Sequence, residues 1–428
     1  MTKKVEVITF GCRLNTYESE VMRNHAKDAG LDNTIIVNTC AVTSEAERQA
    51  RQSIRKLRKE NPNHKIIVTG CAAQVHAEEF SEMGEVDLVI GNDEKMKSDT
   101  YQAMQNPFLG HNQKIKVNDI MEVEEISPHL VSGFDGHTRA FIQVQNGCNH
   151  RCTFCIIPYG RGNSRSVAMG EIVKQIQILV KQGYKEIVLT GVDISSYGED
   201  LPGKPTLGQM VKRLLNLVPE LPRLRISSID CIEIDDDLFN VLKDEPRLMP
   251  HMHLSLQSGD TMILKRMKRR HSADDIVDLV NRLRSCRPDI TFGADIIAGF
   301  PTETEEMFQN TMDIIEKLNI TWVHAFPYSE RKGTPAERIP KKVPMPIRRE
   351  RAKKLRYLSN KLQSNFFKSQ IGNIVNVLVE KNNRGYTEHY ALVEIEDSIP
   401  EGSLVQVQIT GLKSNNTLQG KIIMEEAV

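Results

Sequence analysis

The stretch Gln145-Asn-Gly-Cys-Asn-His-Arg-Cys-Thr-Phe-Cys155 holds three cysteines within eight residues, and we call Cys148, Cys152 and Cys155 the cysteine loop. Iron–sulfur clusters are held by cysteine thiolates, and a 4Fe-4S cubane takes four ligands. Three thiolates therefore bind one cubane and leave its fourth iron open for chemistry. Zinc competes, because its sites usually take four nitrogen or sulfur ligands and His150 offers a fourth. His150 would crowd the turn, so the spacing favours the cluster.

Three further cysteines, Cys12, Cys40 and Cys71, each follow an apolar segment that we predict to be a strand. Residues 1–95 alternate such strands with helical patterns, which predicts a parallel, doubly wound sheet. The carboxyl ends of parallel strands meet at one edge of the sheet, where ligands usually bind. We therefore expect these strand-end cysteines to form a second three-thiolate site.

The composition indicates a soluble protein of two or three domains. The 428 residues include 56 basic and 56 acidic side chains, so a polyanion must meet a local basic patch. No segment reaches the roughly 20 apolar residues of a membrane span, and the start lacks the apolar core of a signal peptide. We expect a cytoplasmic protein with no membrane partner, whose reduced thiols favour metal over disulfides. Cys231 and Cys286 stand alone and are interpreted as buried apolar residues.

Four segments together predict an α/β fold. Residues 1–95 are the doubly wound domain with the strand-end cysteines, and residues 96–137 are interpreted as a linker with little regular structure. Residues 138–368 contain six strand–helix units, which predict a complete or partial parallel barrel with its site at the carboxyl ends of the strands. Residues 369–428 show short strands separated by turns, as in a small antiparallel β-barrel.

A basic segment ends the predicted barrel. Residues 331–368 hold thirteen Lys or Arg and two Glu. A solvated helix with a basic outer face explains this pattern, and so does a nucleic-acid contact. The position just before a small β-barrel favours nucleic acid, with Arg348, Arg349 and Arg351 as candidate contacts.

The cysteine spacing, with Phe154 before the third cysteine, resembles the signature of the radical S-adenosylmethionine superfamily. The wider stretch from Asn146 to Gly162 resembles the methylthiotransferases within it. That family combines a domain with three cluster cysteines, a partial βα barrel and a C-terminal TRAM β-barrel, in the order found here. The resemblance covers nearly the whole chain and implies an enzyme.

The resemblance implies two 4Fe-4S clusters and S-adenosylmethionine as cofactors. The cluster on the cysteine loop binds S-adenosylmethionine at its open iron and cleaves it to a 5′-deoxyadenosyl radical. The strand-end cysteines match the auxiliary cluster, which delivers sulfur for a methylthio group. Radical chemistry suits an unactivated C–H carbon that no side-chain base can deprotonate.

The resemblance also implies cofactor contacts at the strand ends of the barrel. The backbone of Phe154 is expected against the adenine. The run Gly191-Val192-Asp193 departs from the usual Gly-Gly-Glu at its second and third positions, which weakens the expected contact to the methionine amine. A glycine at a strand end is by default a turn residue. The further candidates are Ser228, Gln257, Ser258, Asp295 and Gly299.

Substrate contacts are expected just after the cysteine loop, at Tyr159, Arg161 and Arg165. The run Arg161-Gly-Asn-Ser-Arg-Ser resembles the methylthiotransferase subgroup that acts at C2 of N6-threonylcarbamoyladenosine beside the anticodon of tRNA. A cation facing the carboxylate of that base is chemically sensible. The same arginines could equally cap the following helix or bind phosphate.

Alternatives remain at this point. Gly-Cys-Arg-Leu-Asn around Cys12 favours this subgroup over relatives that modify isopentenyladenosine in tRNA or an aspartate of a ribosomal protein. The expected partners are the anticodon stem-loop of tRNA and a low-potential electron donor, and we expect a monomer. The alternative that is not an enzyme is an RNA-binding protein with structural metal sites.

Overall fold

The first sheet positions the strand-end cysteines. A computed structural model describes residues 5–105, 114–126, 129–131, 133–134, 136–414 and 416–423. Five parallel strands lie in the order β1-β2-β3-β4-β5. They are β1 (Glu6–Thr9), β2 (Thr34–Thr39), β3 (Lys65–Gly70), β4 (Leu88–Ile90) and β5 (Ile115–Lys116). All six residues of β2 are buried, as expected for a central parallel strand covered on both faces.

The helices of this part follow the predicted alternation. They are α1 (Arg13–Asp28), α2 (Ser44–Glu60), α3 (Cys71–Val75), α4 (Ala77–Ser81) and α5 (Ser98–Ala103). The expectation for residues 96–137 needs correction, because α5 and β5 lie there and β5 pairs with β4. A strand of two residues is too short to leave a periodic pattern in the sequence.

Six parallel strands form the central part, as predicted for a partial barrel. They are β6 (Arg139–Gln143), β9 (Glu186–Thr190), β10 (Arg223–Ile226), β11 (His251–Gln257), β12 (Thr291–Ala298) and β13 (Trp322–Pro327). They make two three-stranded sheets, β10-β9-β6 and β11-β12-β13. A parallel bridge between Ile229 and Leu254 links the two. A short hairpin of β7 (Gln145–Asn146) and β8 (Arg165–Ser166) brackets the cysteine loop.

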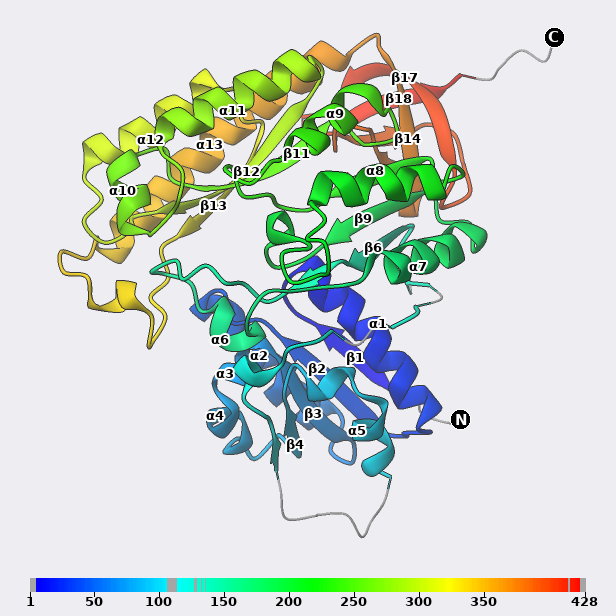
Figure 1. Ribbon diagram of the computed structural model, residues 1–428, viewed down its shortest axis with the longest axis vertical. Helices are drawn as coiled ribbons and strands as arrows, with labels where there is room; N and C mark the ends of the chain where they lie inside the picture. Colours follow the sequence, from blue (N-terminus) through cyan, green and yellow to red (C-terminus); the bar gives the residue numbers. More distant parts are fainter. Residues whose placement is uncertain are drawn as a thin grey trace.

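Helices cover the outside of these strands (Figure 1). They are α7 (Met169–Lys181), α8 (Leu207–Leu217), α9 (Asp236–Asp244), α10 (Thr261–Arg266), α11 (Ala273–Cys286), α12 (Glu305–Lys317) and α13 (Met345–Gln370). The short helix α6 (Ile157–Arg161) lies instead against α3 of the first part. The basic segment is therefore largely one helix, α13, which buries Leu355, Leu358 and Leu362 against the core. Among the described residues, no helix combines the length and apolar character needed to cross a membrane.

The C-terminal part is a closed five-stranded barrel, as predicted. Its strands are β14 (Ile374–Glu380), β15 (Arg384–Tyr386), β16 (Leu392–Ile395), β17 (Leu404–Leu412) and β18 (Leu418–Ile422). Most neighbours are antiparallel, but β16 and β18 pair in parallel, which differs from the purely antiparallel expectation. Turn signals in a sequence mark where strands end, and they do not show which strands close a barrel.

Two buried arginines join the C-terminal barrel to the central part. Arg223 donates to the carbonyls of Tyr386 (3.2 Å) and Asn376 (2.6 Å). Arg225 donates to the carbonyl of Thr387 (2.8 Å) and lies 3.9 Å from the centre of the Tyr390 ring. Since the charged groups are desolvated, this docking is specific as well as polar.

Candidate functional site

The cysteine loop is shaped by a glycine and a cross-loop hydrogen bond. Gly147 has φ +75°, and a side chain there would meet the carbonyl oxygen of Asn163 at 1.8 Å. The backbone N–H of Cys148 donates to the carbonyl of Gly162 (3.0 Å), which closes the loop onto the start of β8. Only glycine fits this conformation and this close approach.

A second set of contacts fixes the far side of the loop. The N–H of Thr153 donates to the carbonyl of Met267 (3.0 Å), and its hydroxyl donates to the carbonyl of Arg266 (2.8 Å). Arg269 lies 3.7 Å from the Cys152 sulfur and 2.8 Å from the Asp230 carboxylate. The loop is therefore held by the segment after α10, and a cation stands beside one thiol.

Gln145 connects the first two strand ends of the barrel. Its amide N–H₂ donates to the carbonyl of Gly147 (2.7 Å), and its oxygen accepts from the N–H groups of Val192 and Asp193. Asp193 in turn lies 3.6 Å from the Cys148 sulfur. Sequence reasoning missed Gln145, because a buried glutamine has no distinctive spacing.

His150 lies against acidic groups beside the cysteine loop. Its Nε2 is 2.9 Å from Asp193 and 3.5 Å from Glu233, and these hydrogen bonds raise the pKa of His150 to about 10. Ligand atoms of Cys148, His150 and Asp193 lie within 4.8 Å of one another. His150 is thus paired to carboxylates, whereas a Cys₃His zinc set would require its neutral ring as a ligand.

The strand-end cysteines come together at one edge of the first sheet. Cys12 caps α1, Cys40 follows β2, and Cys71 begins α3 after β3. Burial raises the pKa of Cys40 to about 12, and the nearby Cys71 and Cys12 thiols raise it further. The three cysteines thus follow neighbouring strands at one edge of the sheet, as the chain order predicts. Metal binding by them would release their protons and stays a prediction.

One strand-end cysteine, Cys71, lies close to the segment that contains the cysteine loop. Figure 1 shows α6, which follows the cysteine loop, packed beside α3 of the first part. A side chain on Gly160 would lie 3.2 Å from Cβ of Cys71. Burial raises the pKa of Cys155 to about 12, and both Cys152 and Cys71 add to the effect. Cys71 is therefore within electrostatic reach of the cysteine loop.

Arg161 lies between these sets in a buried network of charges. Its side chain is only 2% exposed, and its Nε lies 3.1 Å from the Cys71 sulfur. It pairs with Glu18 and donates to Asn15, and Lys95 lies 2.6 Å from the other side of Glu18. Burial opposes ionisation of Glu18, but Arg161 and Lys95 outweigh it and lower the pKa of that carboxyl.

The expected substrate contacts after the cysteine loop need correction. Arg161 and Arg165 are both buried, and Arg165 donates to the carbonyls of Val123 (2.7 Å) and Arg161 (2.9 Å). Their guanidinium groups therefore stabilise the junction of the two parts, a role that differs from the helix cap and the phosphate contact considered from the sequence. Tyr159 differs, since its ring is about half exposed.

The expected cofactor residues separate into two groups. Phe154 belongs to the cysteine loop, and Gly191 packs against Gln145 beside Asp193, so these three adjoin the predicted cluster. The other five residues have contacts or conformations that do not indicate a cofactor. Ser258 accepts from the N–H of Asp260, Gly299 packs on Arg348, Gln257 has φ +67°, Ser228 is exposed, and Asp295 pairs with His253 and His324.

Two of the three arginines expected to contact RNA are buried. Arg348 donates to the carbonyls of Val343 and Tyr328 and pairs with Glu330. Arg351 pairs with Glu303 (2.7 Å) and Glu305 (3.0 Å). Both are thus structural and unavailable to RNA, whereas Arg349 is exposed. A helix with basic side chains on several faces gives little indication of which cations face inward.

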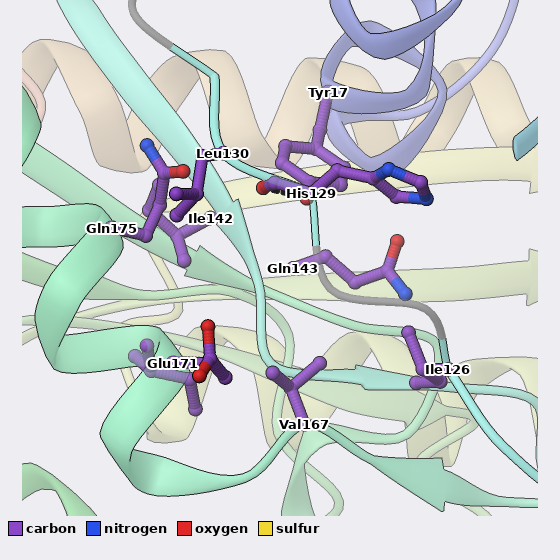
Figure 2. Close-up of a pocket in the computed structure, with 10 residues that line it drawn as sticks. Tyr17, Ile126, His129, Leu130, Ile142, Gln143, Val167, Glu171 and Gln175 are labelled. Carbon is purple, nitrogen blue, oxygen red and sulfur yellow. Dashed lines mark hydrogen bonds between the residues drawn. The ribbon is translucent and has the colours of Figure 1, made fainter. Parts of the chain in front are cut away.

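A small cavity separates α1 from the central part (Figure 2). Its volume is about 20 Å³, and Tyr17, Gln143, Glu171 and Gln175 are among its lining residues. Tyr17 donates to the carbonyl of His129 (3.1 Å), and Gln175 exchanges hydrogen bonds with the backbone of Val131. The space holds about one water molecule, so it is no nucleoside site.

Comparison with known proteins agrees with this architecture. Residues 142–315 match the Radical SAM superfamily, and residues 4–91 match a family described as uncharacterized protein family UPF0004. The threonylcarbamoyladenosine tRNA methylthiotransferase MtaB of Rickettsia prowazekii is 55% identical over 95% of each chain. The protein of that name in Aquifex aeolicus is 36% identical, over 95% of this chain and 100% of its own length.

The comparison also includes a relative whose name gives a different tRNA substrate, and a solved structure with a similar fold. The tRNA-2-methylthio-N(6)-dimethylallyladenosine synthase of Ehrlichia canis is 34% identical over 88% of each chain. The radical S-adenosylmethionine methyltransferase TsrM of Kitasatospora setae has a TM-score of 0.57 at 15% identity, over 78% of this chain and 77% of its own, and shows a similar fold. The Rickettsia prowazekii methylthiotransferase is 55% identical over 95% of each chain, so this chain belongs to the radical S-adenosylmethionine methylthiotransferase family.

Proposed function

We propose that this protein adds a methylthio group to C2 of N6-threonylcarbamoyladenosine beside the anticodon of tRNA. One structural observation carries the proposal: Gly160 and Arg161, which follow the cysteine loop, contact Cys71 of the strand-end cysteines. A radical source and a sulfur donor must be adjacent for one substrate carbon to meet both. The relative at 55% identity bears the name of this activity.

Two 4Fe-4S clusters and S-adenosylmethionine are the proposed cofactors. The cysteine loop would hold one cluster and the strand-end cysteines the other, since each set offers three thiolates and leaves one iron open. When bound, these groups supply the radical from S-adenosylmethionine and the sulfur that is transferred. The chain also needs an external low-potential electron donor.

The surrounding side chains support this assignment by what they hold in place. Gln145 fixes the cysteine loop relative to the end of β9, and Arg269 brings positive charge to Cys152. Arg161 brings positive charge to Cys71. Hydrogen bonds and positive charge at cluster sulfurs stabilise the reduced form, which is the state that transfers electrons.

Transfer RNA would be held by exposed cations of α13 and by the C-terminal barrel. Arg349 and Lys353 are exposed on α13, in contrast to the paired Arg348 and Arg351. A phosphate backbone is bound mainly through such cations. We propose further that the protein acts as a monomer in the cytoplasm.

Isopentenyladenosine is the second candidate substrate, because relatives at 34% identity carry that activity in their names. The experiment that separates the two is nucleoside mass spectrometry of tRNA from a strain lacking the gene. We expect loss of 2-methylthio-N6-threonylcarbamoyladenosine and accumulation of its unthiolated precursor, with restoration by the wild-type gene. Loss of the methylthio isopentenyl nucleoside instead would overturn the substrate assignment.

A further inference from the structure

The inner face of β11, β12 and β13 carries a polar cluster outside both cysteine sets. On β13, Val323 and Ala325 are buried in the core with α13. Because side chains alternate along a strand, His324 and Phe326 point to the opposite face, into the barrel. The strand register pairs His324 with Asp295 of β12.

Asp295 holds two histidines by one carboxylate oxygen. Its Oδ1 lies 3.1 Å from Nε2 of His253 and 3.3 Å from Nδ1 of His324, and the two rings are 4.8 Å apart. Gly293 makes room for His253, since a side chain there would lie 2.5 Å from the ring. The His324 side chain remains 59% exposed, with its Nδ1 taken by Asp295. Its Nε2 is therefore the atom offered to a ligand.

An apolar surface adjoins this cluster on the same face. The register pairs Phe326 with Ile297, one inward position closer to the carboxyl ends of the strands than His324 and Asp295. Phe326 is 41% exposed, which is unusual for a large apolar side chain in a barrel interior. Aromatic rings of this kind stack on unpaired bases.

The cluster opens toward the cysteine loop. Ser255 lies two residues beyond His253 on β11, and Arg269 joins its carbonyl (2.8 Å) to the Cys152 sulfur (3.7 Å). At the other end, the Tyr390 ring of the C-terminal barrel packs 4.9 Å from the ring of His251. A ligand on this face would therefore have the C-terminal barrel at one end and the cysteine loop at the other.

We propose that His324, oriented by Asp295 and His253, binds the threonylcarbamoyl group of the target base, while Phe326 and Ile297 support the adenine. This inference rests on the proposed function. With Nδ1 of His324 on Asp295, a ring that carries a proton on both nitrogens donates from Nε2 to an incoming carboxylate. Such a site distinguishes the anionic threonylcarbamoyl group from an apolar isopentenyl group, and it moves Asp295 from cofactor binding to substrate binding.

The test uses the reconstituted full-length enzyme and two anticodon stem-loop RNAs. One carries N6-threonylcarbamoyladenosine, and the other carries its methyl ester, which lacks the negative charge. His324→Ala should lower kcat/KM for the acid by about 10- to 100-fold, as for loss of a hydrogen bond to a charged group, and should not lower it for the ester. His324→Gln keeps a hydrogen-bond donor and should recover part of the loss.

Controls separate this role from cofactor binding and from folding. His64→Ala, at the opposite end of β3 from Cys71, should leave both substrates unaffected. Formation of 5′-deoxyadenosine without RNA should be unchanged in His324→Ala. If it falls while the preference for the acid over the ester persists, the residue serves the cofactor and the inference is overturned.

Two further outcomes have clear meanings. The ligand atoms of His253, Asp295 and His324 lie within 4.8 Å of one another, so a divalent cation is the competing occupant. Stoichiometric zinc in the wild type that disappears in His324→Ala would overturn the inference. A wild-type enzyme that thiolates neither RNA but still cleaves S-adenosylmethionine contradicts the proposed function. In that case a filter-binding assay of the acid and ester RNAs still tests whether His324 contributes to the preference for the acid.

Discussion

Nε of Arg161 lies 3.1 Å from Sγ of Cys71, although the two residues are 90 positions apart. Arg161 belongs to α6 after the cysteine loop, and Cys71 begins α3 directly after strand β3 of the first sheet. The contact places a buried cation from the radical-forming part on the proposed sulfur-donating cluster. Glu18 and Lys95 complete the charge balance at this junction.

Arg161→Gln should change both stability and redox behaviour. Loss of the buried partner of Glu18 should lower the free energy of unfolding by about 3 kcal/mol, measured by urea unfolding. Loss of the hydrogen bond at Cys71 should shift the reduction potential of one cluster to a more negative value, measured by EPR-monitored titration. Arg48→Gln, which removes an exposed pair with Glu45, is the control and should change neither. Unchanged potentials in Arg161→Gln would argue against its role at the cluster.

Exposed cations of α13 should control tRNA binding. The double variant Arg349→Glu, Lys353→Glu should weaken binding and reduce the slope of log affinity against log salt by about 2, near one per phosphate contact. Lys212→Glu with Arg213→Glu on α8 makes the same change in charge on another exposed helix face and should have little effect. Equal losses in both double variants would show that only net charge matters.

The two arginines beneath the C-terminal barrel should determine how firmly it docks. Arg225→Ala removes hydrogen bonds to Thr387 (2.8 Å) and Glu388 (2.7 Å), together with an ion pair to Glu186. We expect faster proteolytic release of residues 369–428 and a loss of about 3 kcal/mol in stability. Arg384→Ala, in an exposed pair on β15, should preserve protease resistance. Equal resistance of Arg225→Ala and wild type would contradict the docking role.

Glu186 should contribute to acid sensitivity. Burial opposes its ionisation, but Arg225, Arg223 and Arg139 outweigh burial and lower the pKa of Glu186. A lowered folded-state pKa gives stability that is present above the unfolded value of about 4.3 and is lost as pH falls through the folded value. The stability difference between wild type and Glu186→Gln should therefore shrink on acidification below about pH 4.3, measured by urea midpoints. A constant difference across that range would refute the assignment.

The sequence predicted the features that depend on periodicity and chain order. Cys12, Cys40 and Cys71 could be placed together because each follows a strand of a parallel sheet, whose carboxyl ends must coincide. The six parallel strands of the central part and the small C-terminal barrel follow from the same kind of pattern, but the parallel pairing of β16 with β18 does not.

Contacts between distant polar residues could not be predicted. Arg161 was expected to meet substrate, but its partner Glu18 lies 143 positions away, and no local pattern connects them. Arg348 and Arg351 looked like RNA contacts because a basic helix does not show which cations its neighbours neutralise. His324 has no signal of its own, since only strand register brings it to Asp295.

The central claim is that the cysteine loop serves radical formation and the strand-end cysteines serve sulfur delivery. One variant tests this claim most directly. The triple variant Cys12→Ala, Cys40→Ala, Cys71→Ala should fall from about 8 to about 4 iron atoms per chain after reconstitution, as expected for one of two cubanes. It should still convert S-adenosylmethionine to 5′-deoxyadenosine, because the cysteine loop is intact, but should form no methylthio nucleoside on tRNA. Retention of about 8 iron atoms, or formation of the methylthio product, would contradict the account.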